Sequence, residues 1–322
     1  MRIEYWAVLG RAWRRMKDTL FRPVDPVKWL ILAFCAWVAG LLDGHGGGGG
    51  RGVGSHGAGN GSPIDPRDVR EGVQAMLTAI HGAWRWVLGH WGATLFVFVG
   101  IPLLIGLIVV VVWLSSRFKL IFLDNLVRSR AEIVEPWRRL GRLGDSLALF
   151  RLGFGFVAVI IGAALVLTMV GLGIFTAVSR GSVAGIVGLI VGGLVLVAFV
   201  VAAIYISLFL ESFVVPIMYR QNLAVMPAWR VFLPWLSAEG ACFFLYGLFV
   251  LLLYIAAAVV ILAVGFSTCC IGFLVLLIPF VGTLVLLPFI VTYRYLSLEF
   301  LAQFDSRLDV FGPTTPATTA QG

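Results

Sequence analysis

The sequence predicts an all-α integral membrane protein with about six transmembrane helices, arranged as three hairpins that each follow a cytoplasmic amphipathic helix. Three observations support this prediction: the composition, the length of the apolar stretches, and the distribution of the basic residues. Of the 322 residues, 60% are hydrophobic and 12% are charged, and the mean hydropathy is +1.01. Because a soluble domain is typically about a quarter charged, much of this chain's surface is expected to lie against lipid.

Six apolar stretches are candidates for spans. All are much longer than a β-strand, and the strands of a membrane barrel would alternate apolar with polar residues. Helices are therefore expected, since a helix satisfies its own backbone hydrogen bonds in lipid. The first stretch is short for a bilayer core that needs about 20 helical residues. The stretches are Val27–Leu42, Trp91–Leu114, Leu147–Phe175, Val183–Leu210, Ala241–Val264 and Ile271–Val291.

Basic residues predict which side each connection occupies. Nineteen of the 24 Lys and Arg residues lie in the N-terminal segment, in or beside the connections after the second and fourth stretches, or in the tail. The positive-inside rule assigns these segments, and so both chain ends, to the cytoplasm. The many Arg, Gly and Ala residues suggest a bacterial source. The expected location is the cytoplasmic membrane of a prokaryote.

This topology divides the chain into five segments, which comprise three hairpins, an N-terminal segment and a tail. The first hairpin has a Gly-rich outer loop, and the end of that loop shows the helical spacing of an amphipathic helix. The tail is expected to be disordered at its end. The segments are 1–26 (cytoplasmic amphipathic), 27–114 (first hairpin, outer loop 43–90), 115–210 and 211–296 (each an interfacial segment and a hairpin), and 297–322 (cytoplasmic tail).

A repeat connects these segments. Shifting the sequence by 92 positions aligns the two central cytoplasmic connections, and a looser copy at Trp13-Arg14 precedes the first stretch. After the last stretch, YRYLSLEF at 293–300 resembles YISLFLES at 205–212, so Glu299 and Glu211 occupy equivalent positions. The repeat predicts three units of one design, and chance similarity is the alternative. The aligned pairs are Arg128 with Arg220, Trp137 with Trp229, and Arg138 with Arg230.

The Trp-Arg segments form a candidate interface with lipid headgroups. A tryptophan ring is stable at headgroup depth because it is apolar while its N–H can reach water, and an adjacent arginine can contact phosphate. The simpler alternative is that these residues only anchor the topology. The candidate residues are Trp13, Arg14, Arg128, Trp137, Arg138, Arg139, Arg220, Trp229 and Arg230.

A second candidate site is a polar cluster at the cytoplasmic edge of the spans. Its members could line a cavity or bind an ion. The favoured alternative is structural, with the carboxylates pairing with Arg128, Arg220 or Arg294, because structural ion pairs outnumber sites. The cluster consists of Asp124, Asn125, Glu211 and Glu299.

The apolar stretches themselves suggest packing rather than chemistry. The second, fourth, fifth and sixth contain no Asp, Glu, Lys, Arg, His, Asn or Gln, which argues against ion-coupled transport. Gly188 and Gly192 form a GxxxG pair that predicts close helix packing. No catalytic motif and no metal-ligand spacing is present, so neither an enzyme nor a cofactor is expected. The net charge of +8 lies beside apolar runs, which favours anionic lipid headgroups over nucleic acid as partners.

Two segments resemble a known family. They are FLDNLVRSRAEIVEPWRRLGRLGDSLALFRL, from Phe122 to Leu152, and PIMYRQNLAVMPAW, from Pro216 to Trp229. Both resemble an uncharacterised prokaryotic family of multi-pass membrane proteins and, more distantly, the membrane domain of some glycerophosphodiester phosphodiesterases. The resemblance implies the architecture but no activity, because the soluble phosphodiesterase barrel is absent from this sequence.

The combined expectation is a non-catalytic membrane scaffold that organises lipids or an unidentified protein partner through its cytoplasmic surface. The alternative is a transporter or flippase-like conduit for a lipid or a small amphiphile.

Overall fold

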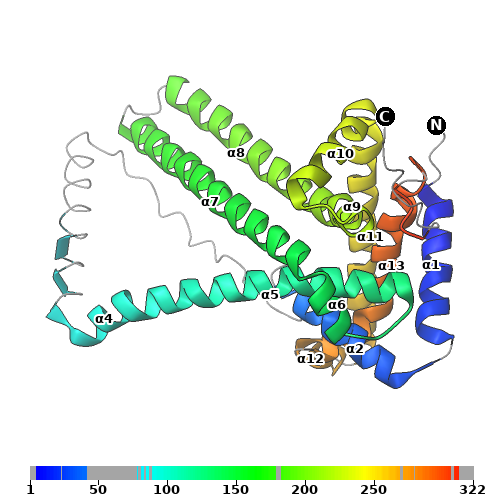
Figure 1. Ribbon diagram of the computed structural model, residues 1–322. Helices are drawn as coiled ribbons and strands as arrows, with labels where there is room; N and C mark the ends of the chain where they lie inside the picture. Colours follow the sequence, from blue (N-terminus) through cyan, green and yellow to red (C-terminus); the bar gives the residue numbers. More distant parts are fainter. Residues whose placement is uncertain are drawn as a thin grey trace, which may run out of the picture. The chain divides into compact units, whose positions relative to one another are not determined.

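The computed structural model describes residues 5–22, 24–41, 78, 81–82, 85–86, 89–178, 183–268, 271–278, 280–305 and 308–311. Within these ranges the regular structure is helical and contains no strand (Figure 1). The predicted Gly-rich outer loop 43–90, its amphipathic helix and the end of the tail lie largely outside the described residues. The main elements are α1 (Tyr5–Phe21), α2 (Pro26–Ala39), α4 (Trp91–Leu95), the π-helix η1 (Phe96–Gly100), α5 (Ile101–Arg128), α6 (Val134–Arg139), α7 (Gly141–Val178), α8 (Val183–Phe209), the π-helix η2 (Leu210–Val214), α9 (Val215–Gln221), α10 (Val225–Ala238), α11 (Gly240–Ser267), α12 (Ile271–Leu277) and α13 (Val281–Leu301).

The chain forms two compact units. The first comprises residues 1–50, 111–150 and 206–322, and the second comprises residues 51–110 and 151–205. The units cut across the first two predicted hairpins, because α5, α7 and α8 each contribute one part to each unit, whereas the third predicted hairpin lies wholly in the first unit. Every buried hydrophobic side chain among the described residues belongs to the first unit. The core of the protein is therefore in the first unit.

Helix α1 packs along α13 through one of its faces. Four α1 side chains spaced by four residues lie in one row, as such spacing requires on a helix, and each is at most 1% exposed. The Thr19 hydroxyl lies 2.7 Å from that of Tyr295 on α13. The N-terminal segment therefore belongs to the core of the first unit. The buried row consists of Val8, Ala12, Met16 and Leu20.

Aromatic rings from η2, α10, α11 and α13 fill the centre of the first unit. The Phe213 ring stacks on Phe232 with centroids 5.4 Å apart and meets Phe243 edge-on at 5.1 Å. Phe243 also lies 4.9 Å from Phe304, which follows α13. Each such pair contributes about 0.5–1.5 kcal/mol beyond the burial of its area. This cluster therefore fixes how the helices around it pack.

Helix α2 corresponds to the first predicted span. It begins at a capped end, where the Asp25 carboxylate accepts the Val27 N–H at 2.9 Å. Its C-terminal end is held to α5, because the Ser115 hydroxyl donates to the Ala39 carbonyl at 2.6 Å. At about 1.5 Å per residue the helix is roughly 21 Å long, against about 30 Å for a bilayer core. It is apolar but shorter than the helices that are long enough to cross a membrane.

The sixth predicted span, Ile271–Val291, is two helices rather than one. Helix α12 ends at Leu277, whereas α13 begins at Val281 and continues to Leu301. Phe280 between them has a φ of 69°, a left-handed conformation that an α-helix cannot contain. Pro279 precedes Phe280 in the sequence, and a proline disfavours the helical conformation of the residue before it. The apolar pattern alone does not indicate this break.

In the second unit, α7 and α8 approach each other through glycines of α8. A Cβ atom added at Gly188 would lie 3.2 Å from the Leu172 side chain, and one added at Gly192 would overlap the Met169 sulfur. The expectation that this GxxxG pair permits close helix packing is confirmed.

Within the described residues, five helices are long and apolar enough to cross a membrane, as expected of a membrane protein. The most apolar windows of α7 and α8 contain no buried residue, while that of α13 is 56% buried. Exposed apolar surface of this length belongs in lipid or against other helices. The five ranges are Phe96–Arg128, Gly141–Thr176, Val183–Gln221, Gly240–Ser267 and Val281–Leu301.

The aromatic core can be tested with two neighbouring substitutions on α11. Phe243 is 0% exposed, so Phe243→Ala leaves a cavity and is expected to lower the free energy of unfolding by about 3–5 kcal/mol. Phe244 is 56% exposed, and Phe244→Ala should cost less than about 1 kcal/mol. Thermal unfolding in detergent compares the variants. Equal melting temperatures for the two would contradict the packing described.

Candidate functional site

Asp124 is the first of three carboxylates near the helix ends of the first unit, two of which, Asp124 and Glu299, are buried. Its side chain is 2% exposed and pairs with Arg128 Nε at 3.1 Å and with Arg139 of α6. The Tyr219 hydroxyl of α9 also donates to it, at 2.6 Å. One carboxylate therefore joins α5, α6 and α9.

Glu299 is the second buried carboxylate, and it holds α1 against α13. The Arg11 Nε donates to it at 2.9 Å, and Arg15 forms a second ion pair with it. The Glu299 side chain is 8% exposed, whereas the two arginines are 40% and 44% exposed. The charges of this cluster therefore extend from the core to the surface of the unit.

Glu211, the third carboxylate, lies in the π-helix η2. Lys119 of α5 forms an ion pair with the carboxylate, and the Arg294 guanidinium of α13 donates to the Glu211 backbone carbonyl at 2.7 Å. Both basic residues are buried, at 6% and 8% exposure. Short π-helices are rare and are frequently found at functional sites, which singles out this cluster.

Asn125, the remaining member of the predicted polar cluster, has a structural setting. It is 1% exposed, and its side-chain oxygen accepts the Glu132 backbone N–H at 3.2 Å. It thus holds the turn that connects α5 with α6.

The structure does not join the predicted polar residues into one site, and it confirms only some of the predicted ion pairs. Arg128 pairs with Asp124 as expected. Glu211 pairs with Lys119, which the sequence did not single out, and Arg294 reaches its backbone instead. The partners differ because helix packing, not proximity in the sequence, decides which charges meet.

The predicted repeat contains a signal that would have found Lys119. Lys119 and Glu211 are 92 residues apart, which is the shift that aligns the two central connections. Since Glu299 aligns with Glu211, equivalent positions of the repeat carry Lys119, Glu211 and Glu299, and the first two form an ion pair. No comparable pattern indicates that Arg11 and Arg15 pair with Glu299.

The tryptophans predicted at the headgroup interface differ in their surroundings. Trp13 is 46% exposed on α1. Trp137 is partly buried and meets Trp113 edge-on at 5.9 Å. Trp229 is also partly buried, with its ring 5.8 Å from Phe232. Two of the three tryptophans therefore take part in packing within the first unit.

The predicted headgroup arginines fall into two groups. Arg128 and Arg139 pair with Asp124, and Arg220 is half-buried. The others are exposed and form no ion pair with a described residue, so they remain available to a headgroup. They are Arg14, Arg138 and Arg230.

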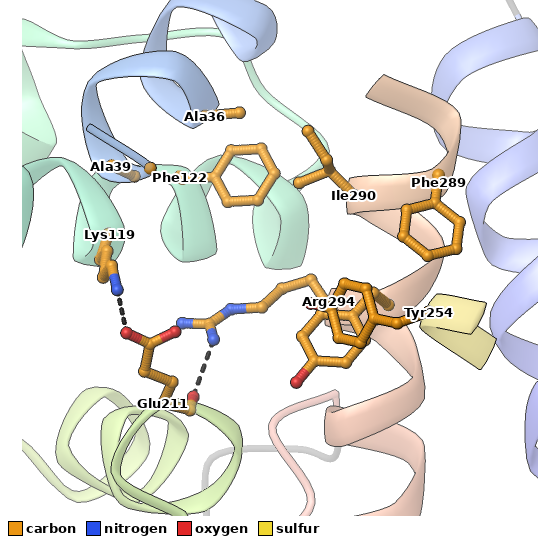
Figure 2. A pocket seen from close by; sticks show the side chains of 11 residues that line it. Ala36, Ala39, Lys119, Phe122, Glu211, Tyr254, Phe289, Ile290 and Arg294 are labelled. Atoms are coloured by element: carbon orange, nitrogen blue, oxygen red, sulfur yellow. Dashed lines mark hydrogen bonds and ion pairs between the residues drawn. The ribbon is translucent and has the colours of Figure 1, made fainter. Parts of the chain in front are cut away.

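A pocket of about 90 Å³ lies beside Glu211 (Figure 2). Its walls come from α2, α5, η2, α11 and α13. Figure 2 shows Lys119, Glu211 and Arg294 together on one side, with the rings of Phe122 and Phe289 elsewhere in the wall. The sequence does not predict this pocket, because the residues that line it lie just beyond the predicted spans or within the apolar spans themselves. Among the described residues, no group of three His, Cys, Asp or Glu side chains could hold a metal ion.

These features define a helical membrane protein whose first unit buries charged side chains in its core. The chain belongs to the family described as a family of unknown function (DUF7544), which it matches over residues 6–301. No curated protein and no solved structure matches the chain. The prediction of an uncharacterised family is confirmed to that extent. The distant resemblance to the phosphodiesterase membrane domain stays a prediction.

The role of Asp124 can be tested by comparing two charge-removing substitutions. Asp124→Asn removes the carboxylate that pairs with both Arg128 and Arg139, and leaves Arg139 only its 3.7 Å pair with the exposed Glu135. Because these arginines are 38% and 35% exposed, we expect a loss of about 2–4 kcal/mol, below that of a fully buried pair. Asp18, 64% exposed and 3.7 Å from Arg22, is the control, and Asp18→Asn should change stability by less than about 0.5 kcal/mol. Thermal unfolding in detergent measures both, and similar losses would contradict a structural role for Asp124.

Proposed function

We propose that this protein is a non-catalytic component of the cytoplasmic membrane of a prokaryote, where its cytoplasmic face organises anionic lipids and, with them, partner proteins. The observation that carries the proposal is the excess of basic side chains at the helix ends of the first unit. Each of the three carboxylates described above has two basic neighbours.

Exposed arginines add to this excess. Arg14, Arg138 and Arg230 belong to α1, α6 and α10, the helices that precede α2, α7 and α11. A basic residue close to an anionic membrane surface contributes about 1 kcal/mol of attraction. Several such residues on one unit favour a local enrichment of anionic lipid, with no reaction required.

Contacts within the first unit support six crossings with both chain ends on one side. Helix α1 is paired with the C-terminal part of α13 through Glu299. The last residues of α5 and α9 meet α6 through Asp124, and the Tyr5 hydroxyl of α1 donates to the Cys242 carbonyl at the start of α11. The chain must then cross the membrane once between α1 and the N-terminal end of α5. Among the described residues, α2 is the apolar helix available for that crossing. The positive-inside rule assigns the shared side to the cytoplasm.

Cysteine labelling tests this topology. Single cysteines at Ser55 and Ser267, in a background without the four natural cysteines, should react with a membrane-impermeant thiol reagent in intact cells. Cysteines at Ser129 and Met226 should react only after permeabilisation, and both positions are exposed, so accessibility within the fold is not limiting. Labelling of Ser129→Cys in intact cells would overturn the six-span topology.

The lipid proposal predicts which arginines retain anionic lipid. In the combined variant R14Q/R138Q/R230Q, the phosphatidylglycerol that co-purifies with the protein and is released by salt should fall at least about fivefold, because each substitution removes about 1 kcal/mol of attraction and so weakens retention at its own position about fivefold. Mass spectrometry of the extracted lipid measures this.

The matched control is Arg85→Gln, because Arg85 is exposed and is expected on the outer side. Equal retention by the wild type and the triple variant would refute the lipid proposal. Movement of labelled lipid between leaflets by the reconstituted protein would instead support a conduit.

A further inference from the structure

We propose that the pocket beside Glu211 binds the headgroup of one anionic phospholipid. This inference goes beyond the surface interaction proposed above, because it assigns one defined pocket within the first unit. The pocket offers about 90 Å³, which is room for about three water molecules or one small anionic group.

The charges of the pocket favour an anion. Lys119 and Arg294 are almost completely buried, and Glu211 supplies the one carboxylate among the residues of the wall. Two buried cations against one carboxylate leave the pocket with a net positive charge. A net positive charge attracts an anion, more strongly in a site partly removed from water than in bulk water, and a headgroup phosphate is such an anion. A guanidinium group matches phosphate oxygens in geometry as well as in charge.

Two tyrosines complete the polar part of the wall. Tyr254 of α11 and Tyr293 of α13 both line the pocket, with ring centroids 5.3 Å apart. A phenol hydroxyl donates hydrogen bonds and its ring packs against hydrocarbon. The pair therefore suits the junction between a headgroup and its acyl chains.

The rest of the wall is apolar, which favours a lipid over free phosphate. Ala36 and Ala39 of α2 and Ile290 of α13 line it, and the small alanines leave space that a larger side chain would fill. A groove of about 470 Å³ along α1, lined by Trp6 and Trp13 among others, shares Phe289 and Tyr293 with the pocket wall. An acyl chain can pack on this apolar surface, whereas inorganic phosphate has no apolar part that could be buried there.

The experiment uses the full-length protein in detergent, stripped of lipid and washed at high salt. Native mass spectrometry counts bound phosphatidylglycerol, and melting temperatures are measured with phosphatidylglycerol, phosphatidylcholine and inorganic phosphate. The wild type should retain one salt-resistant phosphatidylglycerol, and only that lipid should raise its melting temperature. Arg294→Gln removes a charge and Ala36→Phe fills the pocket without changing charge. Each should weaken this binding at least tenfold, while Arg294→Lys, which keeps the charge but not the guanidinium geometry, should bind less tightly than the wild type and more tightly than Arg294→Gln.

The surface variant R14Q/R138Q/R230Q is the control, and it should keep the salt-resistant lipid. If Ala36→Phe binds as well as the wild type, the lipid does not lie in this pocket and the inference fails. Equal stabilisation by phosphate and by phosphatidylglycerol would also overturn it. Circular dichroism and gel filtration check that each variant is folded. If Arg294→Gln misfolds, Ala36→Phe and Arg294→Lys still test whether the lipid binds in this pocket. If the pocket does not bind lipid, the proposal of a surface interaction is unaffected, because that proposal is tested by the phosphatidylglycerol that salt releases.

Discussion

A charge buried among packed helices is costly unless opposite charges meet it, and the first unit meets this condition three times. Asp124, Glu211 and Glu299 are each approached by two basic side chains, and in every case at least one of these comes from another helix. Removing either partner would leave a charge behind, so these contacts constrain which helices can be neighbours. The aromatic core around Phe213 and Phe243 packs the helices of the same unit together. Polar contacts thus select the arrangement and apolar packing stabilises it.

The two units depend on different sources of stability. The first has a buried core of its own, whereas the described apolar stretches of the second contain no buried hydrophobic side chain. For α7 and α8, contact at glycines such as Gly188 supplies close packing between backbones, which is the main attraction available between helices surrounded by lipid. Lipid that binds near the first unit would therefore meet a rigid surface, while the second unit takes much of its stability from its surroundings.

The sequence predicted those parts of the fold that follow from local chemistry. The apolar stretches that became α5, α7, α8 and α11 are recognisable because a helix in lipid must satisfy its own hydrogen bonds over about 20 residues. Apolar periodicity predicted one continuous span where α12 and α13 are separate, and Pro279, beside the positive φ of Phe280, is the residue in the sequence that is compatible with an interruption there. The pairing of Glu299 with Arg11 could not be read from the sequence, since it joins opposite ends of the chain. The contact between Lys119 and Glu211 could have been predicted from the repeat, because the 92-residue shift aligns these two residues. Apolar periodicity does not indicate it, since both residues lie just beyond the predicted spans.

The π-helix η2 has a geometric consequence for the face that follows it. Glu211 and Tyr219 are eight residues apart, and an uninterrupted α-helix would separate them by about 80° around its axis. The wider turn of a π-helix takes up one extra residue, which reduces the separation to roughly 20°. Glu211 can then meet Lys119 while Tyr219 meets Asp124, both on α5. Without that extra residue the segment after Glu211 would be turned by about 100°, so both contacts with α5 could not be made at once, and the π-helix is what allows this segment to meet α5 at two places.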